Sequence, residues 1–200
     1  MKIFFVRHGN TFETGEPSRY IGSRVDVPLT AKGREQAKAA GQKLKRLKCP
    51  TEAIYSGKQD RQRETAKIIR EILAPQAIMN DRIHGLSEID YGPWEGLTND
   101  EIALNWPDEY AAWTEKGTWP AAIFATKEAD ARADLEAFLN EVTDARVGCA
   151  VAVTSQGVMR QLRRLIDGTV GDEAKVKPGN FCEIEIGPEG PKIVSWNVTP

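Results

Sequence analysis

The side chains best suited to chemistry stand close to the N-terminus, in the run Arg7-His8-Gly9. A neutral imidazole is a good nucleophile near pH 7. Attack on a phosphoryl group also needs cationic donors that match the phosphate oxygens, and the planar guanidinium of Arg7 is one. Gly9 lets the backbone turn tightly and brings its N–H groups near an anion. A structural histidine beside a surface arginine is the alternative, but the position of His8 in a turn after a predicted strand favours phosphoryl chemistry.

The run follows a predicted buried strand at residues 2–6, which is rich in β-branched and aromatic residues. Further strands are predicted at 53–56, 149–154, 181–186 and 193–196, the last two around a turn at 187–191. Helices are predicted at 30–47, capped by Thr30, and at 59–73, 127–142 and 156–167. Strands that alternate with helices indicate an α/β fold: a three-layer α/β/α sandwich with a mostly parallel central sheet, in a single domain spanning 1–200. Ligands of such sheets bind beyond the carboxyl ends of the strands, which selects the turns at 7–9 and 154–157.

The composition, with 40% hydrophobic and 28% charged residues, is that of an ordinary globular protein. A formal net charge of -2 argues against nucleic acid or an anionic membrane as the partner. The N-terminal apolar stretch is too short for a signal peptide or a membrane span, so we expect a cytoplasmic protein. The three cysteines, Cys49, Cys149 and Cys182, are scattered and form no CxxC pair, so we expect reduced cysteines and no zinc site.

Arg7-His8-Gly9 extends through Asn10 and Thr11 into a run that resembles the RHG[EN]T signature of histidine phosphatases and cofactor-dependent phosphoglycerate mutases. The resemblance continues in the same order along the whole chain, at Asp26 to Thr30 with Gly33, Gln36 and Ala37; at Ser56 to Ala66; at Leu86, Glu88, Gly92, Trp94, Glu95 and Gly96; at Cys149 to Arg160; and at Asn180. The chain is therefore identified as a member of the histidine phosphatase superfamily, with the phosphoglycerate mutase-like fold.

The resemblance implies a role for four residues. His8 would be transiently phosphorylated, while Arg7 and Arg61 would hold the phosphoryl oxygens and neutralise developing charge. Glu88 would protonate the leaving oxygen and later activate water, which a carboxyl with a raised pKa does well. This chemistry needs no metal ion and no cofactor.

Three further residues are candidates for contact with phosphate. Asn10 and Thr11 either supply polar contacts to the anion or merely cap a turn. Ser23 takes the position of a glycine whose backbone approaches the phosphate in the family, which adds a Cβ where space is tight.

One departure from the family concerns its second histidine, which lies in a turn resembling S-H-G-G-x-x-R. Without a gap Ser155 takes its place, and a shift of one residue puts Gln156 there, so both are candidate phosphate-binding residues. Losing one preorganised donor costs about 2.7–4 kcal/mol, or roughly 100- to 1,000-fold in rate. The other histidine of the chain, His84, is expected in a surface loop, and Arg160 is expected to be structural.

The leading hypothesis is a phosphatase that hydrolyses a small phosphorylated metabolite through phospho-His8, with weak activity. A non-catalytic protein that binds a phosphorylated ligand is the alternative, and a phosphoglycerate mutase comes third, because a mutase must exclude water. The tryptophan-bearing stretch at 105–120 is either a lid that shapes substrate choice or an outer helical excursion whose tryptophans pack on the core. Neither the substrate nor the oligomeric state can be read from the sequence.

Overall fold

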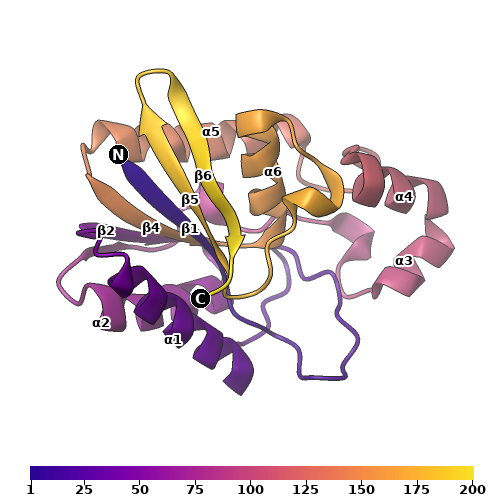
Figure 1. Ribbon diagram of the computed structural model, residues 1–200. Coiled ribbons are helices and arrows are strands. Elements are labelled where there is room, and N and C mark those ends of the chain that lie inside the picture. Colours follow the sequence, from indigo (N-terminus) through magenta and orange to yellow (C-terminus); the bar gives the residue numbers. More distant parts are fainter.

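The computed structural model describes all 200 residues and is built on one six-stranded mixed sheet of order β3-β2-β4-β1-β5-β6 (Figure 1). Its strands are β1 (Lys2–Arg7), β2 (Ala53–Ser56), β3 (Ile78–Asn80), β4 (Cys149–Thr154), β5 (Phe181–Gly187) and β6 (Gly190–Val198). Neighbours among β1 to β4 pair in parallel, whereas β5 runs antiparallel to both β1 and β6. The predicted α/β class is confirmed.

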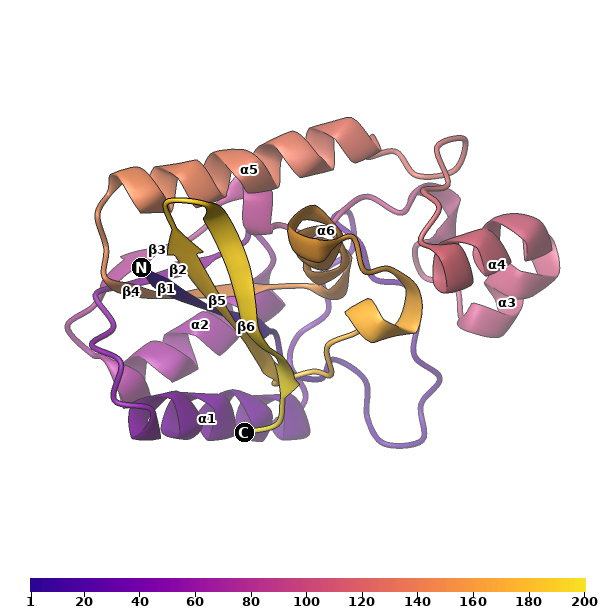
Figure 2. The same cartoon turned by 45° about the horizontal axis from the view of Figure 1, so that its top comes forward.

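Helices cover both faces of this sheet (Figure 2). On one face lie α1 (Ala31–Arg46) and α2 (Asp60–Leu73), and on the other α5 (Glu128–Asp144) and α6 (Gln156–Asp167). Successive strand residues point to opposite faces. Phe4 and Val6 therefore pack into the core beneath α1 and α2, while Ile3 and Phe5 pack into the core beneath α5 and α6. The three-layer sandwich is confirmed.

The largest departure from the sequence prediction is a helical excursion that leaves the sheet between β3 and α5 (Figure 1). It contains α3 (Asn99–Asn105) and α4 (Pro107–Lys116). Short 3-10 turns precede α3 at His84–Leu86 and Gly92–Trp94, and a third follows α6 at Gly171–Ala174. Trp94, Trp113, Trp119 and Phe124 are buried together in a third apolar cluster. The excursion therefore has an aromatic core of its own, whereas the packing alternative had placed its tryptophans on the core of the sheet.

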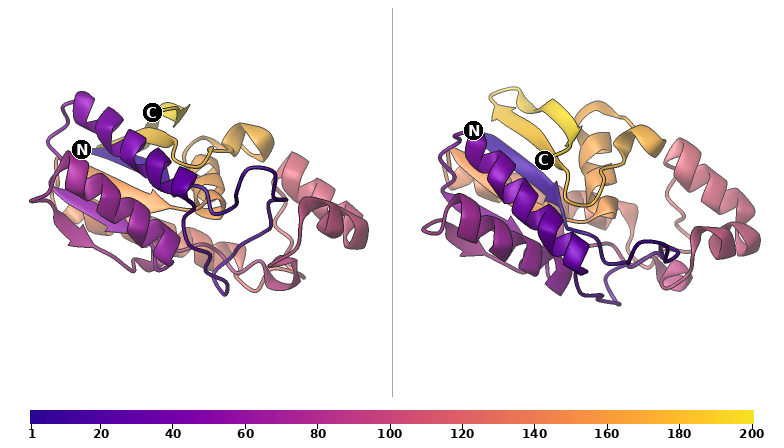
Figure 3. Two further views of the ribbon diagram at one scale, coloured as in Figure 1. Left: turned by 90° about the horizontal axis from the view of Figure 1, so that it is seen from below. Right: turned by 60° about the horizontal axis from the view of Figure 1, so that its bottom comes forward.

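The loop that follows β1 connects the sheet to this excursion. In Figure 3 it leaves the end of β1, runs out toward α3 and α4, and returns to α1. Tyr20 N–H donates to the carbonyl of Leu97, and Arg19 forms an isolated antiparallel bridge with Thr98. The loop and the excursion thus enclose the space beyond the carboxyl end of β1.

Two smaller predictions were incomplete. The edge strand β3 was missed because it has only three residues, too few to show a period. The final hairpin turns through two residues, Pro188 and Glu189, so the predicted five-residue turn was too long and β6 begins earlier than expected. No helix is both long and apolar enough to cross a membrane.

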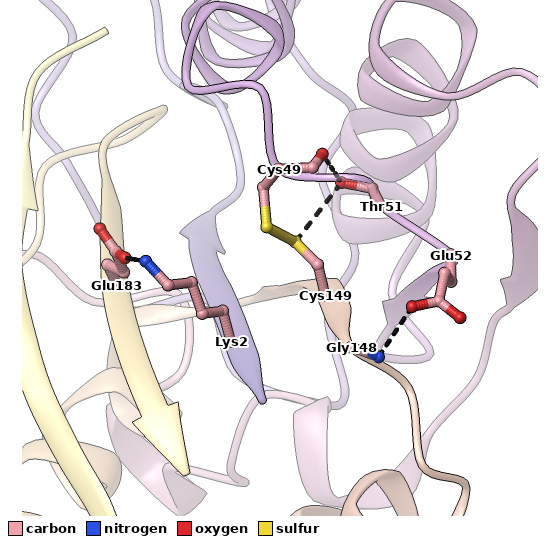
Figure 4. Close-up of a disulfide and its surroundings, with 7 residues drawn as sticks. All are labelled: Lys2, Cys49, Thr51, Glu52, Gly148, Cys149 and Glu183. Carbon is pink, nitrogen blue, oxygen red and sulfur yellow. Dashed lines mark hydrogen bonds and ion pairs between the residues drawn. A yellow bond between two sulfur atoms is a disulfide. The ribbon is translucent and has the colours of Figure 1, made fainter.

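The expectation of reduced cysteines was wrong for two of the three. Cys49, which follows α1, forms a disulfide with Cys149, the first residue of β4, and their Cα atoms are 6.4 Å apart (Figure 4). They are separated by 100 residues, so their proximity follows from the sheet and could not be seen in their spacing. Cys182 is free and buried.

Candidate active site at the carboxyl ends of β1 and β4

A cavity of about 440 Å³ opens beyond the carboxyl ends of β1 and β4, where ligand binding was predicted. Its wall combines the start of the loop after β1, the N-terminal turn of α6 and residues from the excursion. Seven of the predicted site residues line it: Arg7, His8, Asn10, Thr11, Arg61, Glu88 and Gln156. The fold therefore gathers residues that are up to 149 positions apart.

His8 is held in one tautomer by the backbone of the residue that follows it. Its Nδ1 lies 2.8 Å from the carbonyl oxygen of Gly9. Because a carbonyl only accepts, Nδ1 carries the proton and Nε2 keeps its lone pair. Burial lowers the pKa of His8 well below its usual value, and the charges of Arg61 and Arg7 lower it further. His8 is therefore neutral at physiological pH, as a nucleophile must be.

Gly9 permits the close approach of α1 to this turn. A Cβ on Gly9 would lie 2.1 Å from the carbonyl oxygen of Gly33, so no other residue fits. The N–H of Gly9 donates to Thr65 on α2. The backbone around His8 is thus fixed by α1 and α2 together.

Arg7 and Arg61 approach the cavity from different elements. Nη1 of Arg7 donates to the carbonyl of Val176 over 2.6 Å, and Arg61, which is 1% exposed, pairs with Asp26 over 2.9 Å. The Nε–H groups of both arginines are buried and have no acceptor in the protein. Because a buried donor without a partner is costly, this arrangement suits an anion that accepts from both side chains.

Glu88 sits at the N-terminus of α6. Its Oε1 accepts from the N–H of Ile89 over 3.0 Å, and its Oε2 accepts from the N–H of Gly157 over 3.2 Å. Burial raises the pKa of Glu88, and Arg61 and the two N–H donors partly oppose that rise. A Cβ on Gly157 would lie 2.3 Å from Oε1, so this glycine makes room for the carboxyl. Sequence reasoning had assigned Gly157 no role.

Ser155 and Gln156, the two candidate phosphate-binding residues after β4, have different environments. Ser155 is fully buried outside the cavity lining, and its Oγ accepts from Nε2 of Gln62 over 2.7 Å. Gln156 lines the cavity, where its Oε1 accepts from Nη1 of Arg7 over 3.3 Å and from the N–H of Val176 over 3.0 Å. Of the two, the structure brings only Gln156 to His8.

The family model of the histidine phosphatase superfamily (branch 1) matches residues 3–199. The chain belongs to this superfamily. A 2,3-bisphosphoglycerate-dependent phosphoglycerate mutase of Mesorhizobium japonicum is 27% identical over 199 residues, 98% of this chain and 92% of that relative. Phosphoserine phosphatase 1 of Hydrogenobacter thermophilus is 34% identical over 116 residues, 58% of this chain and 52% of that protein.

Solved structures of the superfamily agree with the fold. Bacillus stearothermophilus YhfR is 25% identical, with a TM-score of 0.82 over 100% of this chain and 98% of that one. A mycobacterial glucosyl-3-phosphoglycerate phosphatase is 22% identical, with a TM-score of 0.82 over 100% and 99% of the two chains, and this likeness shows the fold alone. The resemblance inferred from the motifs is confirmed at the level of the superfamily.

Not every candidate reaches the cavity of this superfamily member. Ser23 is exposed and lines a neighbouring cavity, so the structure does not bring it to His8. His84 is exposed, with Nδ1 2.8 Å from Oδ2 of Asp134, and its predicted surface position is confirmed. No group of three or more His, Cys, Asp or Glu side chains is arranged to hold a metal ion.

Sequence reasoning missed part of the cavity wall. Tyr20, Tyr91 and Trp113 line it, and so does Arg160, which had been expected to be merely structural. The missed signal for Arg160 is its spacing: it follows Gln156 by four residues on α6, which puts both on one helix face. The excursion therefore also walls the cavity, and its expected action as a lid stays a prediction.

Proposed function

We propose that this chain is a phosphomonoesterase that hydrolyses a small phosphorylated metabolite through a phosphohistidine intermediate on His8. The observation that carries the proposal is the neutral imidazole of His8, which shares one cavity with the buried, unpartnered Nε–H groups of Arg7 and Arg61. A nucleophile flanked by two fixed cationic donors is what transfer of a phosphoryl group requires. Glu88 adds a carboxyl with a raised pKa.

The reaction would take two steps. First, Nε2 of His8 attacks phosphorus, the bond from phosphorus to the leaving oxygen breaks, and Glu88 gives its proton to that oxygen. Second, a water attacks the phosphohistidine and loses its proton to the Glu88 carboxylate, which releases inorganic phosphate and restores neutral His8. Throughout, Nδ1–H stays bonded to the carbonyl of Gly9, which orients the ring. Arg7 and Arg61 offset the charge that develops on the phosphoryl oxygens.

We also propose that the second histidine of the superfamily is replaced here and that the activity is correspondingly weak. Support comes from the turn after β4, which presents the neutral amide of Gln156 to the cavity. A neutral amide donates a weaker hydrogen bond to phosphate than an imidazolium does. Gln156 would position Arg7 rather than replace the missing charge.

Hydrolysis of 4-nitrophenyl phosphate tests the proposal. We expect slow turnover by the wild-type protein, a loss of at least 1,000-fold in His8→Ala, and no change in His84→Ala, the matched control on the surface. Mass spectrometry after a rapid alkaline quench should find the added phosphate on His8. No hydrolysis of any phosphomonoester, or hydrolysis that survives in His8→Ala, would refute the phosphatase.

A non-catalytic protein that binds a phosphorylated ligand is the second candidate. Gln156 favours this candidate because its side chain is neutral and already accepts hydrogen bonds from Arg7 and Val176. The cavity then lacks the positive charge that the second histidine of the family would supply. Calorimetry with inorganic phosphate would then show binding that needs Arg7 but no turnover. Interconversion of phosphoglycerates by the wild-type protein would instead identify a mutase.

A further inference from the structure

Arg160 stands apart from the residues that would serve the phosphoryl group. It is 8% exposed, and its side chain points from α6 into the cavity. The centre of its guanidinium lies 5.0 Å from the ring centroid of Trp113, on α4. A stacked guanidinium keeps its edge donors free for another ligand.

The other cations that line the cavity are already engaged. Arg61 pairs with Asp26, Arg19 with Glu101, and Lys175 with Asp172. Arg7 donates to the carbonyl of Val176 and to the side chain of Gln156. No carboxylate of the chain lies within salt-bridge distance of Arg160, and no protein acceptor binds its guanidinium.

Arg160 lies in the wall of the cavity, so its donors are left for whatever occupies that space. The stack on Trp113 satisfies none of the five N–H donors of the guanidinium. Those donors match a carboxylate or a phosphate, whose two oxygens accept from a guanidinium side by side. The unpartnered Arg160 therefore points to an anionic ligand group.

The surroundings of Arg160 indicate where in the ligand this anionic group would lie. His8, Arg7 and Arg61 would hold the phosphoryl group at the end of β1. Trp113 and Tyr110, by contrast, line the cavity from the excursion. During attack the ester oxygen lies opposite Nε2 of His8 across the phosphorus, so the rest of the substrate would occupy the part of the cavity that the excursion lines.

We propose that Arg160, stacked on Trp113, is a specificity-determining residue that binds a second anionic group on the leaving-group side of the substrate. The preferred substrates are then phosphomonoesters that also carry a carboxylate or a second phosphate. This inference rests on the proposed function, because only hydrolysis defines a leaving group. Recognition of the second anionic group is a binding property and can be measured without turnover.

Binding to the His8→Ala protein tests the proposal by calorimetry. For the carboxylate we compare 3-phosphoglycerate with glycerol 3-phosphate, which has a hydroxymethyl group in its place. For the phosphate we compare fructose 1,6-bisphosphate with fructose 6-phosphate. We expect the acidic member of at least one pair to bind more tightly. Adding Arg160→Met should weaken the binding of that ligand by about tenfold to a hundredfold, as loss of a charge-assisted hydrogen bond does. It should weaken the binding of the analogue without the second anionic group by less than about threefold.

Arg163 provides the matched control on the same helix. Its guanidinium stacks on Trp196, also at 5.0 Å, but it pairs with Asp167 and does not line the cavity. Arg163→Met should leave all four affinities unchanged. Arg160→Lys, which keeps the charge, should lose less than Arg160→Met and serves as the test if the methionine variant does not fold.

Equal losses for both members of each pair would overturn the proposal, as would no loss with Arg160→Met or no binding of either acidic probe. Its failure is distinguishable from that of the phosphatase. Discrimination without hydrolysis by the wild-type protein would retire the proposed function and keep Arg160 as a ligand-binding residue. Hydrolysis through His8 without a difference between the members of each ligand pair would keep the phosphatase and overturn the role of Arg160.

Discussion

The strands β1 and β4 pair in parallel and end side by side, with Arg7 opposite Thr154 in the register. The turn after β1 delivers His8 to the cavity, whereas the turn after β4 hides Ser155 and presents Gln156. Both turns are fixed by neighbours, since His8 N–H donates to Thr154 and Ser155 accepts from Gln62. The carboxyl end of a strand therefore fixes where a ligand can bind. The buried partners of the turn that follows decide which side chain reaches that position.

After the loss expected in His8→Ala, the largest effect concerns a cation beside the turn after β1. Arg61→Met should lower kcat/KM for 4-nitrophenyl phosphate by about 100- to 1,000-fold, because it removes one preorganised donor to the transition state. Arg34→Met is the control, since Arg34 is an exposed side chain paired with Glu64. Steady-state kinetics would measure both. A loss of less than about fivefold in Arg61→Met would contradict the role given to this arginine.

The turn after β4 can be altered to resemble the turn after β1. Ser155 and Gln62 are both fully buried and bonded to one another, so an imidazole at position 155 needs the space of the Gln62 side chain. The double variant Gln62→Ala/Ser155→His should raise kcat by about tenfold or more, through a restored cationic donor to phosphate.

Each single change supplies a control for that gain. Ser155→His alone should lower thermal stability without a gain in rate, because it overpacks the core. Gln62→Ala alone should leave Ser155 without its donor and also bring no gain. Equal rates in the double variant and the wild type would show that the second turn does not limit the reaction.

The pH dependence of kcat/KM tests both turns through their titrating groups. Burial lowers the pKa of His8, so the neutral nucleophile persists far to the acid side. Burial raises the pKa of Glu88, so its protonated form, the proton donor, persists above the usual carboxyl range. We expect a bell-shaped profile whose alkaline limb falls about tenfold per pH unit once Glu88 ionises. Glu88→Gln should abolish that limb along with most of the activity for alkyl phosphates.

The smallest effect is expected outside both turns. Ser23→Ala should change kcat/KM by less than about twofold, because Ser23 lines the neighbouring cavity rather than the one that holds His8. The same assay measures it. A tenfold effect would contradict the placement of Ser23 outside the cavity that holds His8.

The sequence predicts the first turn well and the second poorly, for a physical reason. His8 directly follows a strongly apolar strand, and Arg7 and Gly9 on either side of it belong to the same local motif. Whether Ser155 reaches the cavity depends on Gln62, which lies 93 residues earlier in the chain. The environment of Arg160 likewise depends on Trp113, on an excursion whose helices no period in the sequence revealed. Contacts of this kind exist only after folding.

The disulfide between Cys49 and Cys149 turns the middle of the chain into a covalent ring. The ring contains β2, α2, β3, α3, α4 and α5, while β1, α1, α6, β5 and β6 are attached outside it. Closing a loop of about 100 residues restricts the unfolded chain by about 4.7 kcal/mol at 25 °C. It also means that one proteolytic cut in the exposed part of α4 opens the ring without releasing a fragment. The two pieces should migrate together until a reductant separates them, so the wall of the cavity can be cut while the chain stays joined.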